Sequence, residues 1–460
     1  MSLTKVSYSM ITGAVYNVLD YGADPTGATS STAAIQAAIN AAAATVGTPL
    51  AQASGGGVVY FPTGVYLSGA LTITTPFVSL QGDGPTASQI KSSGAVNPLL
   101  KVSGGTTSAP AVYSMFIRDM KFTGGGSANN ILMIQNIAWW HVQNCWFEGD
   151  GSTVTTVALP SALVGSFENC IIRAGTSYGV HIYQNSGYTS EPNLITFNTC
   201  NVYSSLTFGL YADGTTQLAL NNCSFELCGN VNDTSHGGVH IANSSPLGIG
   251  PGAVLRGCWF ESNTGVNVRV SERVYSPGAT YLHECNAVGT GVTYGLYVAT
   301  PSSGKRSTAY IYDSNFTNAT TRDIFYDTGS TGNVTNTVYS TILFSSTSAN
   351  AFPYSSGYSL SSAELQSFGS NVLTDNSATP SVTRAGLYLA SNTSATNITN
   401  FADGVEGQVL MIVATNGNTT LVNSASLRLA GAANKTMLTR DSIQLVKQSS
   451  TWYQLSYSTN

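Results

Sequence analysis

The sequence predicts an all-β protein built as a single-stranded parallel β-helix, a solenoid of stacked coils. The first observation behind this prediction is a short phrase, clearest at residues 257–270, in which a small polar residue precedes a cysteine and a large apolar residue follows two positions later. The phrase returns at steps of 23 to 35 residues, a spacing found in solenoid repeats. Its copies stand at Cys145, Cys170, Cys200, Cys223, Cys258 and Cys285, with Met120 and Ser314 in degenerate copies.

The second observation is that each repeat contains three short stretches of alternating apolar and polar residues. A stretch that begins with glycine follows the cysteine phrase, and a third apolar run precedes the next cysteine. Alternation with a period of two, bounded by Gly, Asn and Ser, indicates strands. Two-residue hairpin turns are sparse and no amphipathic helix separates the strands, which disfavours a β-sandwich. We therefore expect the β-helix to span residues 15–325.

The cysteines are expected to be buried, unpaired and structural. Residues at one repeat position stack in a single inward column, with about 4.8 Å between neighbouring strands. Parallel side chains at that spacing fit a relaxed disulfide poorly, so we interpret the thiols as small buried hydrophobes. We predict no metal and no cofactor, because the chain has neither a Cys-x-x-Cys spacing nor a histidine paired with the cysteines.

The composition, polar but poor in charge, suits a ligand rich in hydroxyl groups. Only 8% of the 460 residues are charged, while Gly numbers 47. The net charge of −5 argues against a nucleic-acid partner, which requires a basic surface. The chain has no 18-residue apolar stretch and no visible secretion signal, so we expect a soluble protein that does not insert into a membrane.

The segments outside the repeats predict a cap at one end and a small domain at the other. Residues 1–14 are expected to be a short attachment or tether segment. A helix over 32–44, capped by Ser30 or Ser31, has one apolar face that would cover the open end of the solenoid. Residues 326–400 are rich in Ser, Thr and Asn and predict a transition region. The alternating runs of 401–460 predict a small antiparallel β domain.

The segment 15–84 resembles the start of the pectate-lyase-like right-handed β-helices of bacteriophage tailspikes. The resemblance lies in Asn17-Val18-Leu19-Asp20-Tyr21-Gly22-Ala23, in the Ala-Ala-Ile-Gln helix at 33–36 and in the strand at 57–66. The resemblance implies a homotrimeric receptor-binding protein that binds, and often cleaves, a bacterial capsule, exopolysaccharide or O-antigen. It also implies assembly in the host cytoplasm, a place on the virion tail through a baseplate or another tail protein, and action at the bacterial surface. Whether a larger particle-binding domain precedes this segment stays open. The last domain is similar to C-terminal modules of phage tail proteins, which implies trimerisation or carbohydrate binding.

Candidate catalytic residues lie in the outward column three positions after the cysteine. Glu226 and Glu261 occupy this column on adjacent coils, as the paired carboxyls of a glycoside hydrolase require. Trp146, Glu148 and Trp259 are candidate sugar-binding residues, since aromatic faces pack on sugar rings and carboxylates accept bonds from hydroxyls. A purely structural role for the acids, as caps of the following turn, is the alternative.

The strand that follows the glycine supplies a second set of candidates. It places His181, Tyr211, His240, Asn267 and Tyr297 in one outward column and Tyr183, Asp213 and Arg269 in the next. We interpret Asp213 as a third candidate catalytic acid. The residues expected to position the sugar are Tyr211, His240, Arg269, Tyr183 and His181.

Two other functions stay open at this point. A polysaccharide lyase acting by β-elimination on a uronic-acid polymer would use His240, Tyr211 and Arg269, although the acidic cluster of a calcium-dependent lyase is not apparent. A non-catalytic adhesin would hold glycan on Trp146 and Trp259. The sequence identifies neither the polysaccharide, its linkage nor the host, and a homotrimer could build its site between chains.

Overall fold

The computed structural model divides the chain into two compact units, Met1–Ser359 and Leu360–Asn460. The residues that the structure describes are 15–46, 55–107, 109–124, 130–150, 153–173, 175–242, 252–271, 280–288, 292–299, 308–312, 314–316, 319–326, 337–340, 371–373, 376–382 and 386–459. The expected attachment segment 1–14 and most of the expected transition region lie outside them. Among the described residues, no helix has the length and hydropathy needed to span a membrane.

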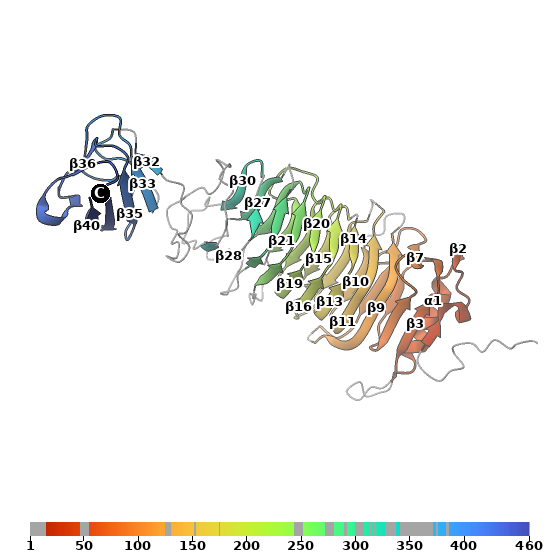
Figure 1. Cartoon of the computed structure of the whole chain (residues 1–460). Coiled ribbons are helices and arrows are strands. Elements are labelled where there is room, and N and C mark those ends of the chain that lie inside the picture. The colour runs from red at the N-terminus through yellow and green to blue at the C-terminus, as the bar shows by residue number, and fades with distance from the viewer. Residues whose placement is uncertain are drawn as a thin grey trace, which may run out of the picture. The chain divides into compact units, whose positions relative to one another are not determined.

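The first unit is a stack of coils, each built from three parallel strands (Figure 1). Two arrays of strands join in one large sheet, and a third array forms a separate ten-stranded sheet. Every ladder within these arrays is parallel, and each strand pairs with its counterpart one coil away. The predicted parallel solenoid is therefore confirmed.

The first array contains β1 (Val15–Asn17), β3 (Gly57–Phe61), β6 (Val78–Gly82), β13 (Leu163–Glu168), β16 (Asn193–Asn198), β19 (Thr216–Asn221), β22 (Ala253–Arg256), β25 (Thr280–His283), β28 (Thr308–Tyr312) and β31 (Thr337–Ser340). The second array contains β2 (Thr26–Ser30), β4 (Gly64–Ser68), β7 (Ser88–Ser92), β14 (Ile171–Arg173), β17 (Asn201–Tyr203), β20 (Ser224–Glu226), β23 (Trp259–Glu261), β26 (Asn286–Val288) and β29 (Asn315–Phe316). The strands β9 (Ala111–Thr123) and β11 (Ile137–Glu148) run through both arrays.

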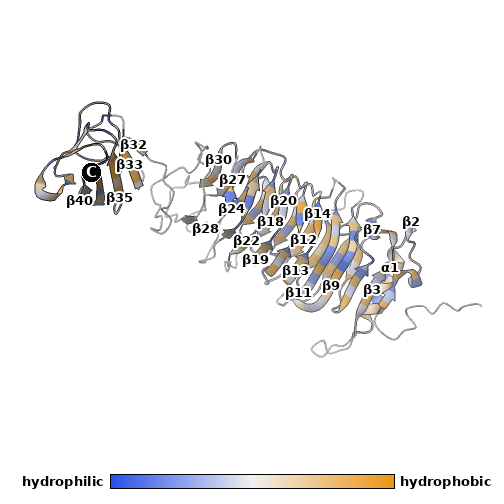
Figure 2. Cartoon of the chain, in the orientation of Figure 1, coloured by the Kyte–Doolittle hydropathy of each residue, from blue (hydrophilic) through white to orange (hydrophobic). Residues whose placement is uncertain are grey.

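The ten-stranded sheet contains β5 (Leu71–Ile73), β8 (Leu100–Ser103), β10 (Asn130–Gln135), β12 (Thr155–Pro160), β15 (Tyr178–Tyr183), β18 (Phe208–Asp213), β21 (Gly237–Ala242), β24 (Gly265–Val270), β27 (Val292–Val298) and β30 (Arg322–Tyr326). Apolar and polar residues interleave along these strands (Figure 2). Every second side chain along a strand therefore points into the core, and the side chains between them form the outer face.

The bend between the first and second arrays lies just before the cysteine of each coil. The residue at this bend has a positive φ of about 50–60° in every described coil from Asp119 onward, a conformation that Asn, Asp and Gly adopt most readily. The bend residues are Asp119, Asn144, Asn169, Thr199, Asn222, Gly257 and Glu284. Asp119 and Glu284 are thus turn residues, as their place in the phrase indicates.

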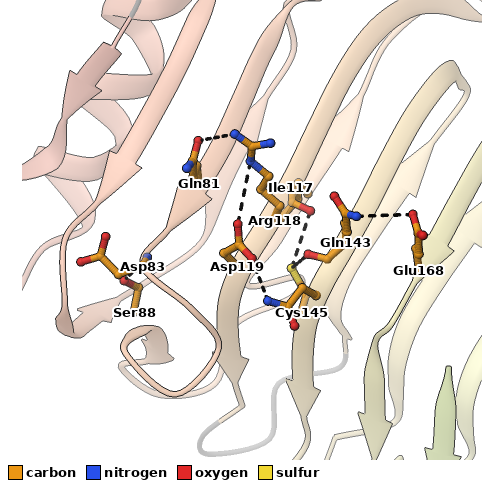
Figure 3. Close-up of polar contacts among 10 residues, drawn as sticks. Gln81, Asp83, Ser88, Ile117, Arg118, Asp119, Gln143, Cys145 and Glu168 are labelled. Carbon is orange, nitrogen blue, oxygen red and sulfur yellow. Dashed lines mark hydrogen bonds and ion pairs between the residues drawn. The ribbon is translucent and has the colours of Figure 1, made fainter. Parts of the chain in front are cut away.

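The cysteines are buried and unpaired, as predicted. The Cys145 thiol donates to the carbonyl oxygens of Gln143 (3.2 Å) and Ile117 (3.6 Å), the latter one coil earlier (Figure 3). Burial raises the pKa of the Cys145 thiol to about 12. Two positions later, Phe122 and Phe147 stack with ring centroids 5.2 Å apart, so the inward columns continue from coil to coil. The thiols act as packing groups in this core.

The helix α1 (Thr32–Ala43) covers the N-terminal end of the solenoid (Figure 1). It buries one apolar face, formed by Ile35, Ala38, Ile39 and Ala42. Ser31 occupies the N-cap position, but its hydroxyl accepts from the Asp24 amide at 2.8 Å instead of from a helix amide. The capping hydrogen bond expected from Ser30 or Ser31 is therefore absent, because Ser31 fastens the preceding loop. A 3₁₀ turn, η2 (Val18–Tyr21), follows β1.

The second unit contains mixed sheets, which corrects the expected antiparallel domain. Its strands are β32 (Asn371–Leu373), β33 (Gly386–Ala390), β34 (Thr396–Ile398), β35 (Val409–Ala414), β36 (Thr419–Leu421), β37 (Leu427–Arg428), β38 (Lys435–Met437), β39 (Ser442–Gln448) and β40 (Thr451–Ser458), with a 3₁₀ turn η4 (Ala430–Ala432). Parallel pairs such as β33–β35 stand beside antiparallel pairs such as β39–β40. Alternation reveals which face a residue occupies but not the direction of the neighbouring strand, so the sequence pattern could not separate the two. A buried core around Phe401 and Trp452 holds the unit together.

Candidate functional site

The outer face of the second array carries the predicted acid column. Ladder register places one residue per coil in it, in the order Thr123, Glu148, Arg173, Tyr203, Glu226, Glu261 and Val288. The neighbouring column runs Lys121, Trp146, Ile171, Asn201, Ser224, Trp259 and Asn286. Both columns follow the order that the cysteine alignment predicts. Glu226 and Glu261 are direct partners on adjacent coils.

At its N-terminal part, this face is an ionic network centred on Glu148. Lys121 Nζ lies 2.5 Å from Glu148 Oε2, and Arg173 Nη2 lies 2.7 Å from Glu148 Oε1. Arg173 also donates to the Tyr203 hydroxyl at 3.1 Å, and the Lys121 ammonium lies 5.5 Å from the centroid of the Trp146 ring. Two cations therefore bind the Glu148 side chain, one at each carboxyl oxygen, while Trp146 is half-buried beside the lysine.

Further along the same face, Glu226 and Glu261 have neutral partners. The Asn201 side-chain amide donates to Glu226 Oε1 at 3.1 Å, and the Trp259 indole donates to Glu261 Oε2 at 2.9 Å. Among the described residues, no Lys, Arg or His nitrogen comes within ion-pair distance of either carboxyl. Glu261 is exposed, and 38% of Trp259 remains exposed beside it. This part of the face presents two oriented carboxyls and an accessible indole to solvent.

The outer face of the ten-stranded sheet carries the second predicted column, with one correction. Ladder register aligns His181, Tyr211, His240, Arg269 and Tyr297 on successive coils. The expected place of Asn267 in this column was wrong. Asn267 lies opposite Gly238 in the ladder and is buried. Its side-chain oxygen accepts a hydrogen bond from the Asn263 amide at 2.9 Å. Arg269, expected one column further, takes its place beside His240.

Two histidines and a tyrosine stack along this second column. The Tyr211 ring lies 5.1 Å from His181 and 4.8 Å from His240, measured between centroids. Desolvation lowers the pKa of His181 to about 4, against a smaller opposing effect of Asp213. Burial and then the Arg269 charge hold the pKa of His240 well below its usual range. Both imidazoles are therefore neutral at pH 7, and His240 Nε2 pairs with the Ser271 hydroxyl at 2.6 Å.

Asp213 and Tyr183 belong to the same sheet, one column further along the strands. They pair with each other across the ladder, and Asp213 pairs next with Ala242. The Tyr211 hydroxyl donates to Asp213 Oδ2 at 3.5 Å, and the Tyr183 ring stacks on His181 with centroids 4.3 Å apart. Asp213 thus accompanies the aromatic column, whereas Glu226 and Glu261 lie in the other sheet.

The sequence reasoning missed two features of this surface. Trp139 is 57% exposed, because a positive φ of 66° and a register shift between Ala138 and Trp140 turn its side chain outward. The two consecutive tryptophans break the period-two pattern, and that break is the signal that could have revealed the bulge. The ion pair of Glu148 with Lys121 runs diagonally between the two columns, and that with Arg173 runs along the acid column, so the network would emerge only from reading both columns together. Within the described ranges, no group of three His, Cys, Asp or Glu residues could hold a metal ion.

Two known families match parts of this chain. Residues 15–245 match the family described as rhamnogalacturonase A/epimerase, pectate lyase-like. Residues 367–453 match the phage depolymerase C-terminal β-sandwich domain. No curated protein matches the chain significantly.

Solved structures share the fold. The tailspike of an Acinetobacter phage superposes with a TM-score of 0.54 at 11% identity, covering 98% of this chain and 81% of that one. A protein of Geobacillus virus E2 gives a TM-score of 0.46 at 19% identity, and 66% of this chain spans 62% of its length. The catalytic unit of an α-1,3-glucanase from Streptomyces thermodiastaticus gives 0.41 at 18% identity, with 71% and 68% covered. The first of these similarities supports the fold alone.

Proposed function

Since the chain belongs to the rhamnogalacturonase A/epimerase family of pectate-lyase-like proteins, we propose that it is a phage tailspike that binds and hydrolyses a bacterial surface polysaccharide. The match of residues 367–453 to a phage depolymerase domain supports the phage context and a polysaccharide substrate. The name of the Acinetobacter protein as a tailspike supports a place on the virion tail. We propose a homotrimer as the assembled form, to be checked by sedimentation.

The observation that carries hydrolysis is the arrangement of Glu226 and Glu261. Their backbones stand one rung apart, about 4.8 Å, with both side chains directed outward. Glycoside hydrolysis requires two carboxyls, separated by roughly 5–5.5 Å for retention of configuration or 6.5–9.5 Å for inversion. Outward side chains on adjacent rungs span this range by rotation about their own bonds.

The neutral partners of the two acids support the same role. A general acid has to take up and release a proton, and a carboxyl clamped by cations resists protonation. Asn201 and Trp259 orient the carboxyls through single hydrogen bonds and leave their second oxygens for substrate. The exposed Trp259 would stack on a sugar ring beside Glu261, while Trp146 and Glu148 would contact the polymer further along the face.

A second candidate function, β-elimination on a uronic-acid polymer, is favoured by the other column. The His240 imidazole is neutral, stands beside Arg269 in register, and stacks with Tyr211. A neutral base beside a cation is what proton abstraction next to a carboxylate needs. Arg269, however, donates to the carbonyl of Thr234 and His240 pairs with Ser271, whereas Glu261 is exposed, so hydrolysis at the two acids is the better-supported proposal.

A product analysis on a panel of purified capsular and O-antigen polysaccharides tests the proposal. We expect one polymer to be shortened, with new reducing ends and without the absorbance of an unsaturated uronate. Appearance of that absorbance would establish the lyase and move the catalytic assignment to His240, Tyr211 and Arg269. Binding without shortening would identify an adhesin and contradict the assignment of Glu226, Glu261 and Asp213 as catalytic residues.

A further inference from the structure

An exposed leucine stands beside the acid pair, at the corner where the second array ends. Leu227 follows Glu226 directly and is 58% exposed. Its amide donates to the Glu261 carbonyl oxygen at 3.1 Å, which ties the leucine to the next coil at the second acid. The backbone of Leu227 is therefore linked to both candidate catalytic residues, by the peptide bond to Glu226 and by the hydrogen bond to Glu261.

The same corner occurs on the coils before and after, with serine in place of leucine. Ser204, Leu227 and Ser262 have φ values of 58°, 54° and 53°. The residue that follows each of them is buried. Side chains other than Gly, Asn and Asp seldom adopt this left-handed conformation. Because serine serves at both neighbouring corners, the fold does not require a leucine at 227.

Two more exposed apolar side chains follow these corners in the chain. Leu206 is 42% exposed on the preceding coil, and Val231 is 46% exposed in the loop that follows Leu227. Hydrogen bonds hold this loop, since the Asp233 carboxylate pairs with His236 at 2.7 Å and the Thr234 carbonyl accepts from Arg269. The loop that follows Leu227 is therefore held in place, and Leu227 itself adjoins Glu226 in the chain and Glu261 through its amide.

We propose that Leu227 selects a methyl-bearing sugar next to the bond that is cleaved. The sugar would be a 6-deoxyhexose or an acetylated residue. This inference rests on the proposed function, because it takes the polysaccharide as the occupant of the corner. An aliphatic side chain offers no hydrogen bond to a hydroxyl but gains by covering a methyl group that water would otherwise surround. Trp259 would stack on the face of the sugar ring, and Leu227 would contact the methyl substituent.

The substitution Leu227→Ser tests the proposal, because it installs the residue found at both equivalent corners. Leu194→Ser is the matched control: Leu194 is 48% exposed and has a φ of 51°, but it lies at the start of β16 in the first array. We expect Leu227→Ser to raise KM for the cleaved polysaccharide roughly tenfold with little change in kcat, since the contact is present in both ground and transition states. Leu194→Ser should match the wild type, and the melting temperatures of all three should agree within a few degrees.

The source of the methyl group is distinguished by treating the same polysaccharide with mild base to remove O-acetyl groups. If Leu227 contacts an O-acetyl group, the KM of the wild type on the treated polymer rises to that of Leu227→Ser. If the tenfold difference persists, the methyl belongs to a 6-deoxy or N-acetylated sugar, and sugar analysis of the polymer must find one.

Three outcomes overturn the inference. A wild type that neither binds nor cleaves any polysaccharide in the panel removes the proposed function and this inference with it. A Leu227→Ser variant within twofold of the wild type removes the inference and leaves the function intact. A variant whose sedimentation changes while its KM does not would show that another chain, and not the glycan, covers the corner.

Discussion

Glu148 and the pair Glu226–Glu261 occupy one column of one sheet, yet their surroundings differ in kind. Lys121 and Arg173 bind both oxygens of Glu148, whereas an amide and an indole each contact one oxygen of the other two acids. The position in the repeat decides only that a side chain faces outward. Its neighbours in the same column and in the adjacent one decide whether a carboxylate is a fixed part of the surface or is available for chemistry.

The largest effect is expected when Glu226 receives a cationic neighbour like that of Glu148. Asn201 stands to Glu226 as Lys121 stands to Glu148, one column across and one coil earlier. We expect Asn201→Lys to pair with Glu226, lower its pKa and reduce kcat about a hundredfold, the scale of a lost proton-transfer group. Asn201→Met, which removes the hydrogen bond without adding charge, should cost several-fold less. Equal losses in both variants, measured by reducing-end kinetics, would contradict the electrostatic explanation.

The column on the ten-stranded sheet predicts a pH dependence of stability. His181 has a native pKa of about 4, below the value near 6.5 of an unfolded chain. Between these values the unfolded state binds more protons, so the free energy of unfolding is greatest above pH 6.5 and falls as the pH approaches 4. After a discount for partial exposure, this contribution is about 2 kcal/mol. His181→Phe, which keeps the stacking, should flatten that slope in urea titrations at pH 7.5 and 4.5. An unchanged slope would contradict the assignment.

Neutralising the ion-paired acid should affect stability more than turnover. Glu148→Gln leaves Lys121 and Arg173 without their shared partner, and we expect a loss of about 1–2 kcal/mol in the free energy of unfolding. The value is kept low because the Arg173 side chain is 42% exposed. We expect kcat to stay within a fewfold of the wild type. A drop in kcat as large as that of Asn201→Lys would place Glu148 among the catalytic groups.

The two tryptophans allow the smallest and most local test. Trp259→Phe keeps an aromatic ring but removes the indole donor to Glu261, and we expect kcat/KM to fall about fivefold, the scale of one hydrogen bond. Trp146→Phe, the same substitution in the same column, alters a ring beside Lys121 and should change kcat/KM less. Equal effects of the two substitutions would show that the Trp259 hydrogen bond is not used.

The columns could be predicted because parallel stacking turns one repeat position into one line of residues. Cys145 and its equivalents fixed the register of the second array, and the predicted order from Glu148 to Glu261 is present. The predicted position of Asn267 was wrong because it rested on aligning Gly265 with Gly238. Gly238 is buried within a strand, whereas Gly265 has a φ of 90° and begins one, so the two glycines serve different purposes. The valines at 239 and 268, which fill the core, mark the true register.

The contacts between side chains could not be predicted from the repeat pattern. The ion pairs of Glu148 combine a diagonal contact with Lys121 and a contact with Arg173 along the column, and the outward turn of Trp139 and Leu227 depends on single left-handed residues. The alternation rule holds only for extended backbone. A left-handed residue changes which face the following side chains occupy, and the amino-acid composition does not reveal it. The fold is a property of the repeat, whereas the candidate site consists of departures from it.

The most direct test of the account is the turnover of Glu226→Gln and Glu261→Gln on the polysaccharide that the wild type cleaves. Glu168→Gln is the control, because Glu168 is an exposed acid of the first array that accepts from Gln143 at 3.5 Å (Figure 3). We expect each of the two variants to lose at least about a thousandfold in kcat while it keeps its fold and its affinity, and Glu168→Gln to be unchanged. Turnover within tenfold of the wild type in either variant would show that this pair of carboxyls does not perform the chemistry.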